Sequence, residues 1–181
     1  CWARRWVSIN INQAIVIHRW GVVVQVSVDM ETGWLAENVR ADLSWQVRLT
    51  TAQVAGFKAA LDHAAALDKP LLQMTPADFP LPSECVQVLS QARSITQGPW
   101  GFALIKGFPV HEWTEAQTRL AYWGMGLHLG VARPQNINSD YLTDVRDAGG
   151  SYLIKGGRGY NTRAKLDFHI DSGDVVGLMC R

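Results

Sequence analysis

Hydrophobic residues recur every three or four positions in three stretches of the chain, which is the spacing of one face of an α-helix. Thr50, Ser83 and Thr114 stand at the starts of these stretches, where a hydroxyl group can cap the first turn. A glutamine follows Thr50 and Thr114 three residues later, which completes a capping box. The pattern predicts helices over residues 50–67, 83–97 and 114–129, ended by Pro70, by Gly98-Pro99 and by Gly130.

Short apolar runs between glycine and proline residues predict strands elsewhere. Residues 101–109 form one such run, with the composition of a buried strand. After the third helix, short strands are predicted over residues 141–145, 151–155, 166–171 and 174–179, separated by glycine-containing turns. Helices that come first and strands that follow predict an α+β chain, and no linker divides it into several domains.

The triplet His169-Ile170-Asp171 lies in one of these predicted strands. Side chains two residues apart leave an extended strand on the same face, so the imidazole and the carboxylate can bind one cation. Together with a second imidazole from elsewhere, they form a ligand set for non-haem Fe(II) that leaves positions open for substrate and dioxygen. Chance alone yields about 0.3 such triplets in a chain of this composition. The triplet therefore needs support from its surroundings.

Three segments of the chain follow the pattern of a known family. The run GPWGFALIKGFPV, the helix predicted after it, and the run LDFHIDSGDVVGLMC resemble, in order and spacing, the taurine dioxygenase-like (TauD/TfdA) branch of the Fe(II)/2-oxoglutarate-dependent oxygenases. The resemblance covers residues 34–181, as the N-terminal portion of such a domain, and leaves residues 1–33 as an N-terminal extension of open assignment. It implies that His169 and Asp171 are two of three iron ligands. Fe(II), 2-oxoglutarate as co-substrate, dioxygen and a small organic substrate are the implied partners, and the implied activity is a hydroxylation.

The family pattern also contains features that follow the triplet. The resemblance implies a third iron ligand, a later histidine, and an arginine that binds 2-oxoglutarate, but no histidine follows His169 and Arg181 lies too early for that role. The implied fold has N-terminal helices followed by a double-stranded β-helix, the jelly roll of clavaminate synthase-like proteins. We expect this jelly roll to be truncated here, which would leave a strand edge unpaired and the isolated chain loosely packed and inactive.

Other interpretations of the same residues stay open. The chain is also compatible with a non-catalytic remnant, or with a pseudoenzyme that serves as a binding module without the distal histidine and the arginine. His169 and Asp171 are compatible with a hydrogen-bonded strand histidine and a carboxylate near a turn. Lys165 lies where the resemblance places substrate contacts, but the residue type favours a solvated lysine at a strand end.

Composition and charge narrow the classes of partner. Seventeen basic and 16 acidic residues give a net charge of +1. This charge provides no electrostatic field strong enough to attract nucleic acid or an anionic membrane. No apolar stretch approaches the roughly 18 residues of a membrane span. Three cysteines without a Cys-x-x-Cys pair predict a reducing, cytoplasmic setting. Residues 1–28 contain no acidic residue, which is similar to an organelle-targeting leader and keeps that alternative open. The sequence predicts no oligomeric state.

Overall fold

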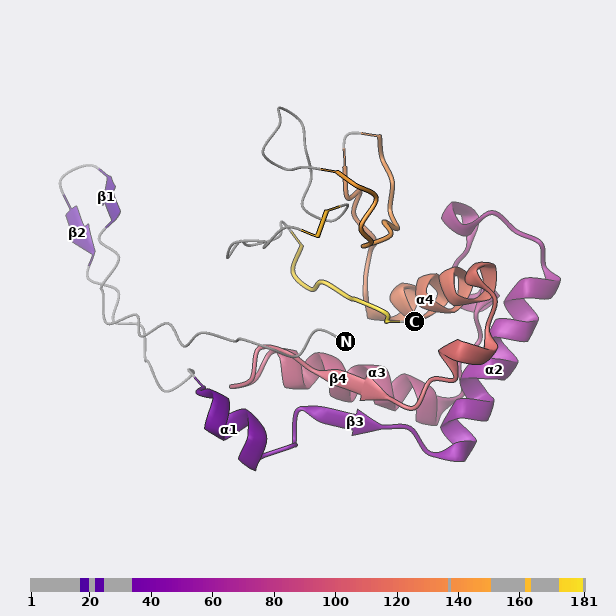
Figure 1. Ribbon diagram of the computed structural model, residues 1–181, viewed down its shortest axis with the longest axis horizontal. Coiled ribbons are helices and arrows are strands. Elements are labelled where there is room, and N and C mark those ends of the chain that lie inside the picture. Colours follow the sequence, from indigo (N-terminus) through magenta and orange to yellow (C-terminus); the bar gives the residue numbers. More distant parts are fainter. Residues whose placement is uncertain are drawn as a thin grey trace. The chain divides into compact units, whose positions relative to one another are not determined.

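The computed structural model describes residues 34–136, 138–150, 162–163 and 173–180, together with the backbone of two strands nearer the N-terminus. These strands, β1 (Ile17–Arg19) and β2 (Val22–Val24), pair antiparallel (Figure 1). The rest of the predicted extension and the strands predicted over residues 151–155 and 166–171 lie outside the described residues. The chain divides into two compact units, one of Cys1–Ala60 and Pro80–Pro109, the other of Leu61–Phe79 and Val110–Arg181.

All three predicted helices are present, as α2 (Thr51–Ala66), α3 (Ser83–Thr96) and α4 (Glu115–Leu129). Both predicted capping boxes form. At the start of α4, the Gln117 backbone N–H donates to the Thr114 hydroxyl at 3.2 Å, and the Thr114 N–H donates to the Gln117 side chain at 2.9 Å. The predicted cap at Ser83 is wrong, because Pro82 precedes the helix and only its backbone carbonyl accepts, from the N–H groups of residues 85 and 86.

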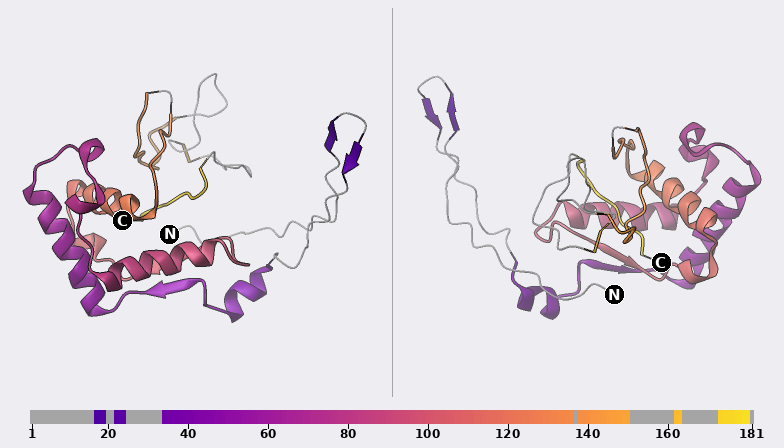
Figure 2. Two further views of the ribbon diagram at one scale, coloured as in Figure 1. Left: turned by 180° about the vertical axis from the view of Figure 1, so that it is seen from behind. Right: turned by 45° about the horizontal axis from the view of Figure 1, so that its top comes forward.

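The strand predicted over residues 101–109 is confirmed in a shorter form, as β4 (Leu104–Lys106). It pairs in parallel with β3 (Gln46–Arg48), and Val47 stands opposite Ile105. The views of Figure 2 show the two strands side by side, and α3 packs against β3. The short helix α1 (Ala36–Ala41) precedes β3. Three 3-10 turns complete the described elements: η2 (Leu71–Gln73), η3 (Pro76–Asp78) and η4 (Val110–Glu112).

The core of the first unit is built from the start of α2, from α3 and from β3. Phe57 is 2% exposed and meets Phe108 edge to face, with ring centroids 4.9 Å apart. Cys85 is fully buried, and its thiol donates to the Gln53 carbonyl oxygen at 3.4 Å. Burial raises the pKa of this thiol, so it stays protonated at neutral pH. Cys85 is therefore a packing residue in this unit rather than a reactive thiolate.

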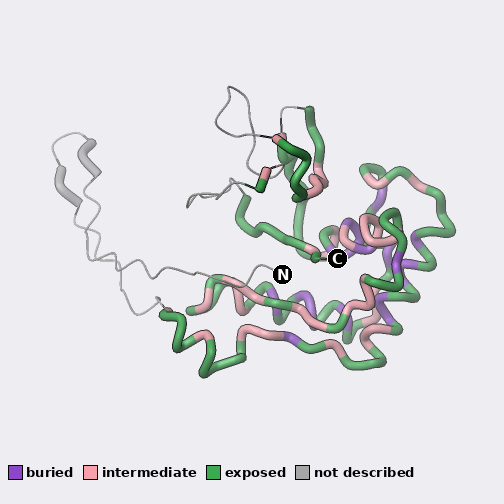
Figure 3. Tube along the Cα trace, viewed as in Figure 1, coloured by how far each residue is buried: buried purple, intermediate pink, exposed green. Residues whose placement is uncertain are grey.

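The core of the second unit forms where α4 packs on η3. Phe79, which follows η3, is fully buried, and its ring lies directly against the backbone of Gly124. Trp123 is buried as well and contacts Tyr141 edge to face, with ring centroids 6.0 Å apart. Trp113 is 5% exposed. The sequence favours packing over substrate stacking for both tryptophans, and their burial supports that interpretation. Figure 3 shows such buried positions gathered on the helices.

The strands predicted over residues 141–145 and 174–179 are wrong as regular elements, because both segments consist of bends and irregular backbone. Alternating apolar residues give a segment strand propensity, but a strand exists only where a neighbour completes its hydrogen bonds. Within the described residues neither segment has such a neighbour, and Val145, Val175 and Leu178 are exposed. The jelly roll itself stays a prediction. No helix in the described part of the chain has the length and apolar character to cross a membrane.

Asp78 is expected to make the second unit sensitive to acid. Its carboxylate accepts from the Lys69 ammonium at 2.8 Å and from the Thr75 backbone N–H at 2.7 Å, and these bonds lower its pKa from 3.8 to about 2. Because the folded pKa lies below the unfolded one, the stabilisation is present above pH 3.8 and is lost as the pH falls towards 2. Urea unfolding across this range should show a weaker pH dependence for Asp78→Asn than for the wild type. Equal pH dependence in the two proteins would contradict the assignment.

Candidate functional site

The predicted iron ligands His169 and Asp171 lie outside the described residues, as does Lys165. The interpretation of His169 and Asp171 as ligands continues to rest on donor chemistry, since a neutral imidazole nitrogen and a hard carboxylate oxygen together suit Fe(II). Among residues 34–136, 138–150, 162–163 and 173–180, no three His, Cys, Asp or Glu side chains are grouped so that they could hold a metal ion.

Two other histidines have partners of their own in the structure. The Nε2 atom of His128, in the last turn of α4, lies 2.8 Å from the Phe79 carbonyl oxygen. His111 has an 80% exposed side chain, with its Nε2 atom 3.6 Å from the Glu112 carboxylate. In the sequence, neither histidine has ligand spacing to His169.

The described segment nearest the triplet begins two residues after Asp171 and contacts α4. A Cβ atom at Gly177 would lie 2.6 Å from the Tyr122 hydroxyl oxygen, so the backbone of this segment comes close to the end of the Tyr122 side chain. Burial raises the pKa of Tyr122, whose hydroxyl therefore stays protonated at neutral pH. The segment that follows the triplet thus lies beside α4 at Tyr122.

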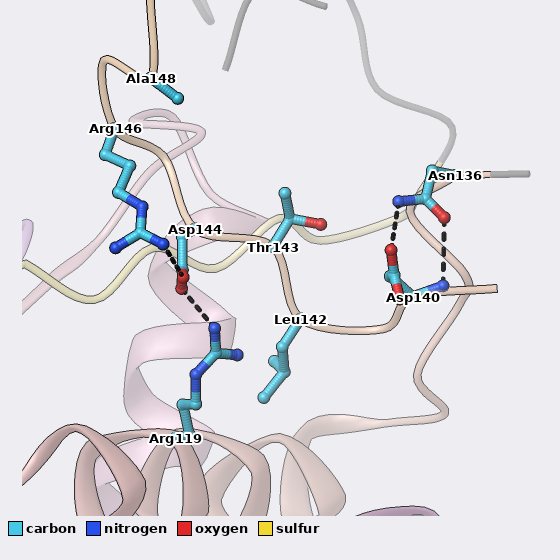
Figure 4. A pocket seen from close by; sticks show the side chains of 8 residues that line it. All are labelled: Arg119, Asn136, Asp140, Leu142, Thr143, Asp144, Arg146 and Ala148. Atoms are coloured by element: carbon cyan, nitrogen blue, oxygen red, sulfur yellow. Dashed lines mark hydrogen bonds and ion pairs between the residues drawn. The ribbon is translucent and has the colours of Figure 1, made fainter. Parts of the chain in front are cut away.

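A polar hollow of about 440 Å³ lies between α4 and the loop of residues 136–148. Figure 4 shows the side chains that line it. The apolar members are Leu142 and Ala148. The polar members are Arg119, Asn136, Asp140, Thr143, Asp144 and Arg146. The hollow is open to solvent rather than enclosed, and most of its lining is polar.

Ion pairs fasten the loop to the helix at one side of this hollow. The Nη2 atom of Arg119 lies 2.6 Å from Oδ1 of Asp144. The helix places Glu115 four residues before Arg119, and its Oε1 atom lies 3.5 Å from the Arg119 Nε atom. Arg146 is more distant, with its Nη2 atom 3.6 Å from Oδ2 of Asp144. The negative charge of Asp144 is therefore compensated mainly by the guanidinium group of Arg119.

Hydrogen bonds within the loop shape the other side of the hollow. The Asn136 side-chain oxygen accepts from the backbone N–H groups of Asn138 and Asp140, at 2.9 and 3.1 Å. Its amide group donates to Oδ2 of Asp140 at 2.7 Å. Asn136 thus fixes the backbone at residues 138 and 140, as asparagine side chains commonly do in turns.

Sequence reasoning missed this hollow. Arg119 and Asp144 are 25 residues apart, one on a helix and the other in a segment interpreted as a strand. The available signal was the alternation of charge in Asp144-Val145-Arg146-Asp147, which suits a loop that pairs with charged neighbours better than it suits a strand with one buried face.

Comparison with known proteins finds an enzyme that is similar to part of the chain. Over 101 residues the chain is 34% identical to FR-33289 synthase from Streptomyces rubellomurinus (strain ATCC 31215). The match covers 55% of this chain and 28% of the synthase, so the chain spans under a third of that relative's length. No family model matches the chain. The similarity therefore relates part of this chain to an enzyme named as a synthase.

Proposed function

We propose that this chain belongs to an Fe(II)/2-oxoglutarate-dependent dioxygenase of the TauD/TfdA type, which hydroxylates a small organic substrate. The observation that carries the proposal is the triplet His169-Ile170-Asp171, placed after the run at residues 98–110 in the order that the family requires. The partial identity to a synthase supports an enzymatic function. Because the match covers 28% of that relative, the reaction is proposed for the full-length protein.

In this proposal His169 supplies a neutral nitrogen ligand and Asp171 an anionic oxygen ligand. The carboxylate would compensate part of the positive charge of the metal, and the neutral imidazole would add no charge. Two such ligands would leave coordination positions of the metal for exchangeable ligands. The bound Fe(II) would supply the activation of dioxygen that is coupled to decarboxylation of 2-oxoglutarate to succinate. A third histidine and an arginine that pairs with the far carboxylate of 2-oxoglutarate are proposed for the remainder of the full-length protein.

One described ion pair supports the scaffold that this proposal needs. Arg119 and Asp144 hold the loop after α4 on that helix, and Gly177, which follows the triplet, lies close to Tyr122 of the same helix. Site residues in proteins are commonly presented by loops that a rigid element positions. We assign to Lys165 a contact with the substrate, and to the protein a cytoplasmic location.

The test is the formation of succinate by the full-length protein. We expect conversion of 2-oxoglutarate to succinate that requires both Fe(II) and dioxygen and stops when a chelator is added. The assay follows the co-substrate, so it can precede identification of the primary substrate. Turnover that is insensitive to the chelator, or the absence of turnover in protein that has bound Fe(II), would overturn the proposal.

A further inference from the structure

The hollow beside α4 contains one acidic and one basic side chain that are not paired with each other. Asp140 is exposed, and its Oδ2 atom accepts from the Asn136 amide. Within the described residues its carboxylate forms no ion pair with a cationic side chain. A carboxylate has room for about four hydrogen bonds, so most of the accepting capacity of Asp140 stays available to a ligand.

Arg146 supplies the opposite charge. Its side chain is 71% exposed, and its contact with Asp144, at 3.6 Å, is longer than a hydrogen bond. Asp144 already accepts from Arg119 at 2.6 Å, which leaves it little need for a second cation. The planar guanidinium of Arg146 therefore keeps donors for an oxoanion, which it can bind with two parallel hydrogen bonds.

Thr143 adds a polar group without a partner. Its hydroxyl oxygen is buried and forms no hydrogen bond within the part of the chain that the structure describes. In Figure 4, Thr143 and Leu142 lie between Arg146 at one end of the hollow and Asp140 at the other. A buried hydroxyl without a partner is uncommon and costs free energy. The Thr143 hydroxyl is covered in the structure, so a ligand could bond to it only after a local shift of the side chains around it.

From the charges of Asp140 and Arg146 we propose that the hollow binds a small zwitterion, with its ammonium group against Asp140 and its anionic group against Arg146. A ligand with only a negative charge would leave Asp140 uncompensated and meet repulsion from it, and a ligand with only a positive charge would do the same at Arg146. The short methylene chain of an ω-amino acid would pass Leu142 and Thr143. The proposal does not depend on the iron site, and iron is absent from its test.

The test is the affinity of the full-length, metal-free protein for ω-amino acids of increasing chain length, measured by calorimetry. The n-alkylamine and the n-alkyl carboxylate of the same length serve as matched probes with one charge each. For the chain length that spans the hollow, we expect the ω-amino acid to bind at least about tenfold more tightly than either matched probe. Equal affinity for the three probes, or no binding at any length, would overturn the proposal.

Two variants assign the ends of the ligand. Asp140→Asn should weaken binding of the ω-amino acid and of the alkylamine while leaving the carboxylate unchanged, and Arg146→Gln should give the converse pattern. Arg93→Gln, which removes an exposed arginine in α3, is the matched control and should change none of the affinities. Circular dichroism establishes that each variant is folded. If both variants bind all three probes as the wild type does, the hollow is not the binding site and the proposal is wrong.

Discussion

Replacing His169 by alanine is expected to abolish the Fe(II)-dependent turnover of 2-oxoglutarate in the full-length protein. Under the proposed assignment, the substitution removes the neutral nitrogen donor and leaves Asp171 as the remaining proposed ligand of the triplet. Loss of an outer partner of a metal ligand typically lowers affinity or activity roughly 10- to 100-fold, so loss of a ligand should exceed about 100-fold. The measurement is the initial rate of succinate formation at saturating Fe(II).

A second histidine provides the control for this experiment. His63 is exposed in the last turn of α2, so His63→Ala removes an imidazole from a helix surface without disturbing the core. We expect wild-type turnover in this variant and a loss in Asp171→Ala as large as that in His169→Ala. If His169→Ala were as active as His63→Ala, the imidazole at position 169 would not be a ligand.

Gly124→Ala is expected to destabilise the second unit by about 1–3 kcal/mol, although alanine favours helices. A Cβ atom at this position would overlap the Cδ2 atom of the Phe79 ring, well inside van der Waals contact. Phe79 is fully buried, so its ring cannot turn out into solvent and the packing of α4 on η3 must shift. Urea unfolding followed by tryptophan fluorescence measures the change.

Gly126→Ala in the same helix is the matched control. A Cβ atom at Gly126 would meet nothing within 4 Å, so the gain in helix propensity should appear undiminished, as a stabilisation of up to about 1 kcal/mol. A Phe79→Ala background should reduce the cost of Gly124→Ala, because the ring that the new methyl group meets is gone. Equal stabilisation by the two glycine substitutions would contradict the close packing of α4 on Phe79.

The three long helices could be predicted because their signals are local. At α4, the cap of Thr114 and Gln117 lies within four residues, and the apolar spacing repeats over several turns. The strand β3 was missed because it has only three residues, and its partner β4 begins more than fifty residues later. No short-range pattern reports such a pairing, since it depends on where α2 and α3 return the chain.

Less of the site could be predicted than of the fold. The segment of residues 141–145 has the composition of a strand, but the structure uses it as a loop whose Asp144 pairs with Arg119 on α4. That pairing joins two elements whose relation depends on tertiary packing, so local sequence could not indicate the hollow. For His169 and Asp171, the spacing and the family resemblance remain the basis of the prediction, because both residues lie outside the described part of the chain.

The most direct test of the iron site is an anaerobic titration of the full-length protein with Fe(II) and 2-oxoglutarate, followed by visible absorbance. Chelation of 2-oxoglutarate to a protein-bound ferrous ion produces a charge-transfer band. We predict a band that saturates with Fe(II), that disappears in His169→Ala and Asp171→Ala, and that persists in His63→Ala. A band of unchanged intensity in the first two variants would show that the metal is held elsewhere and would contradict the assignment of His169 and Asp171.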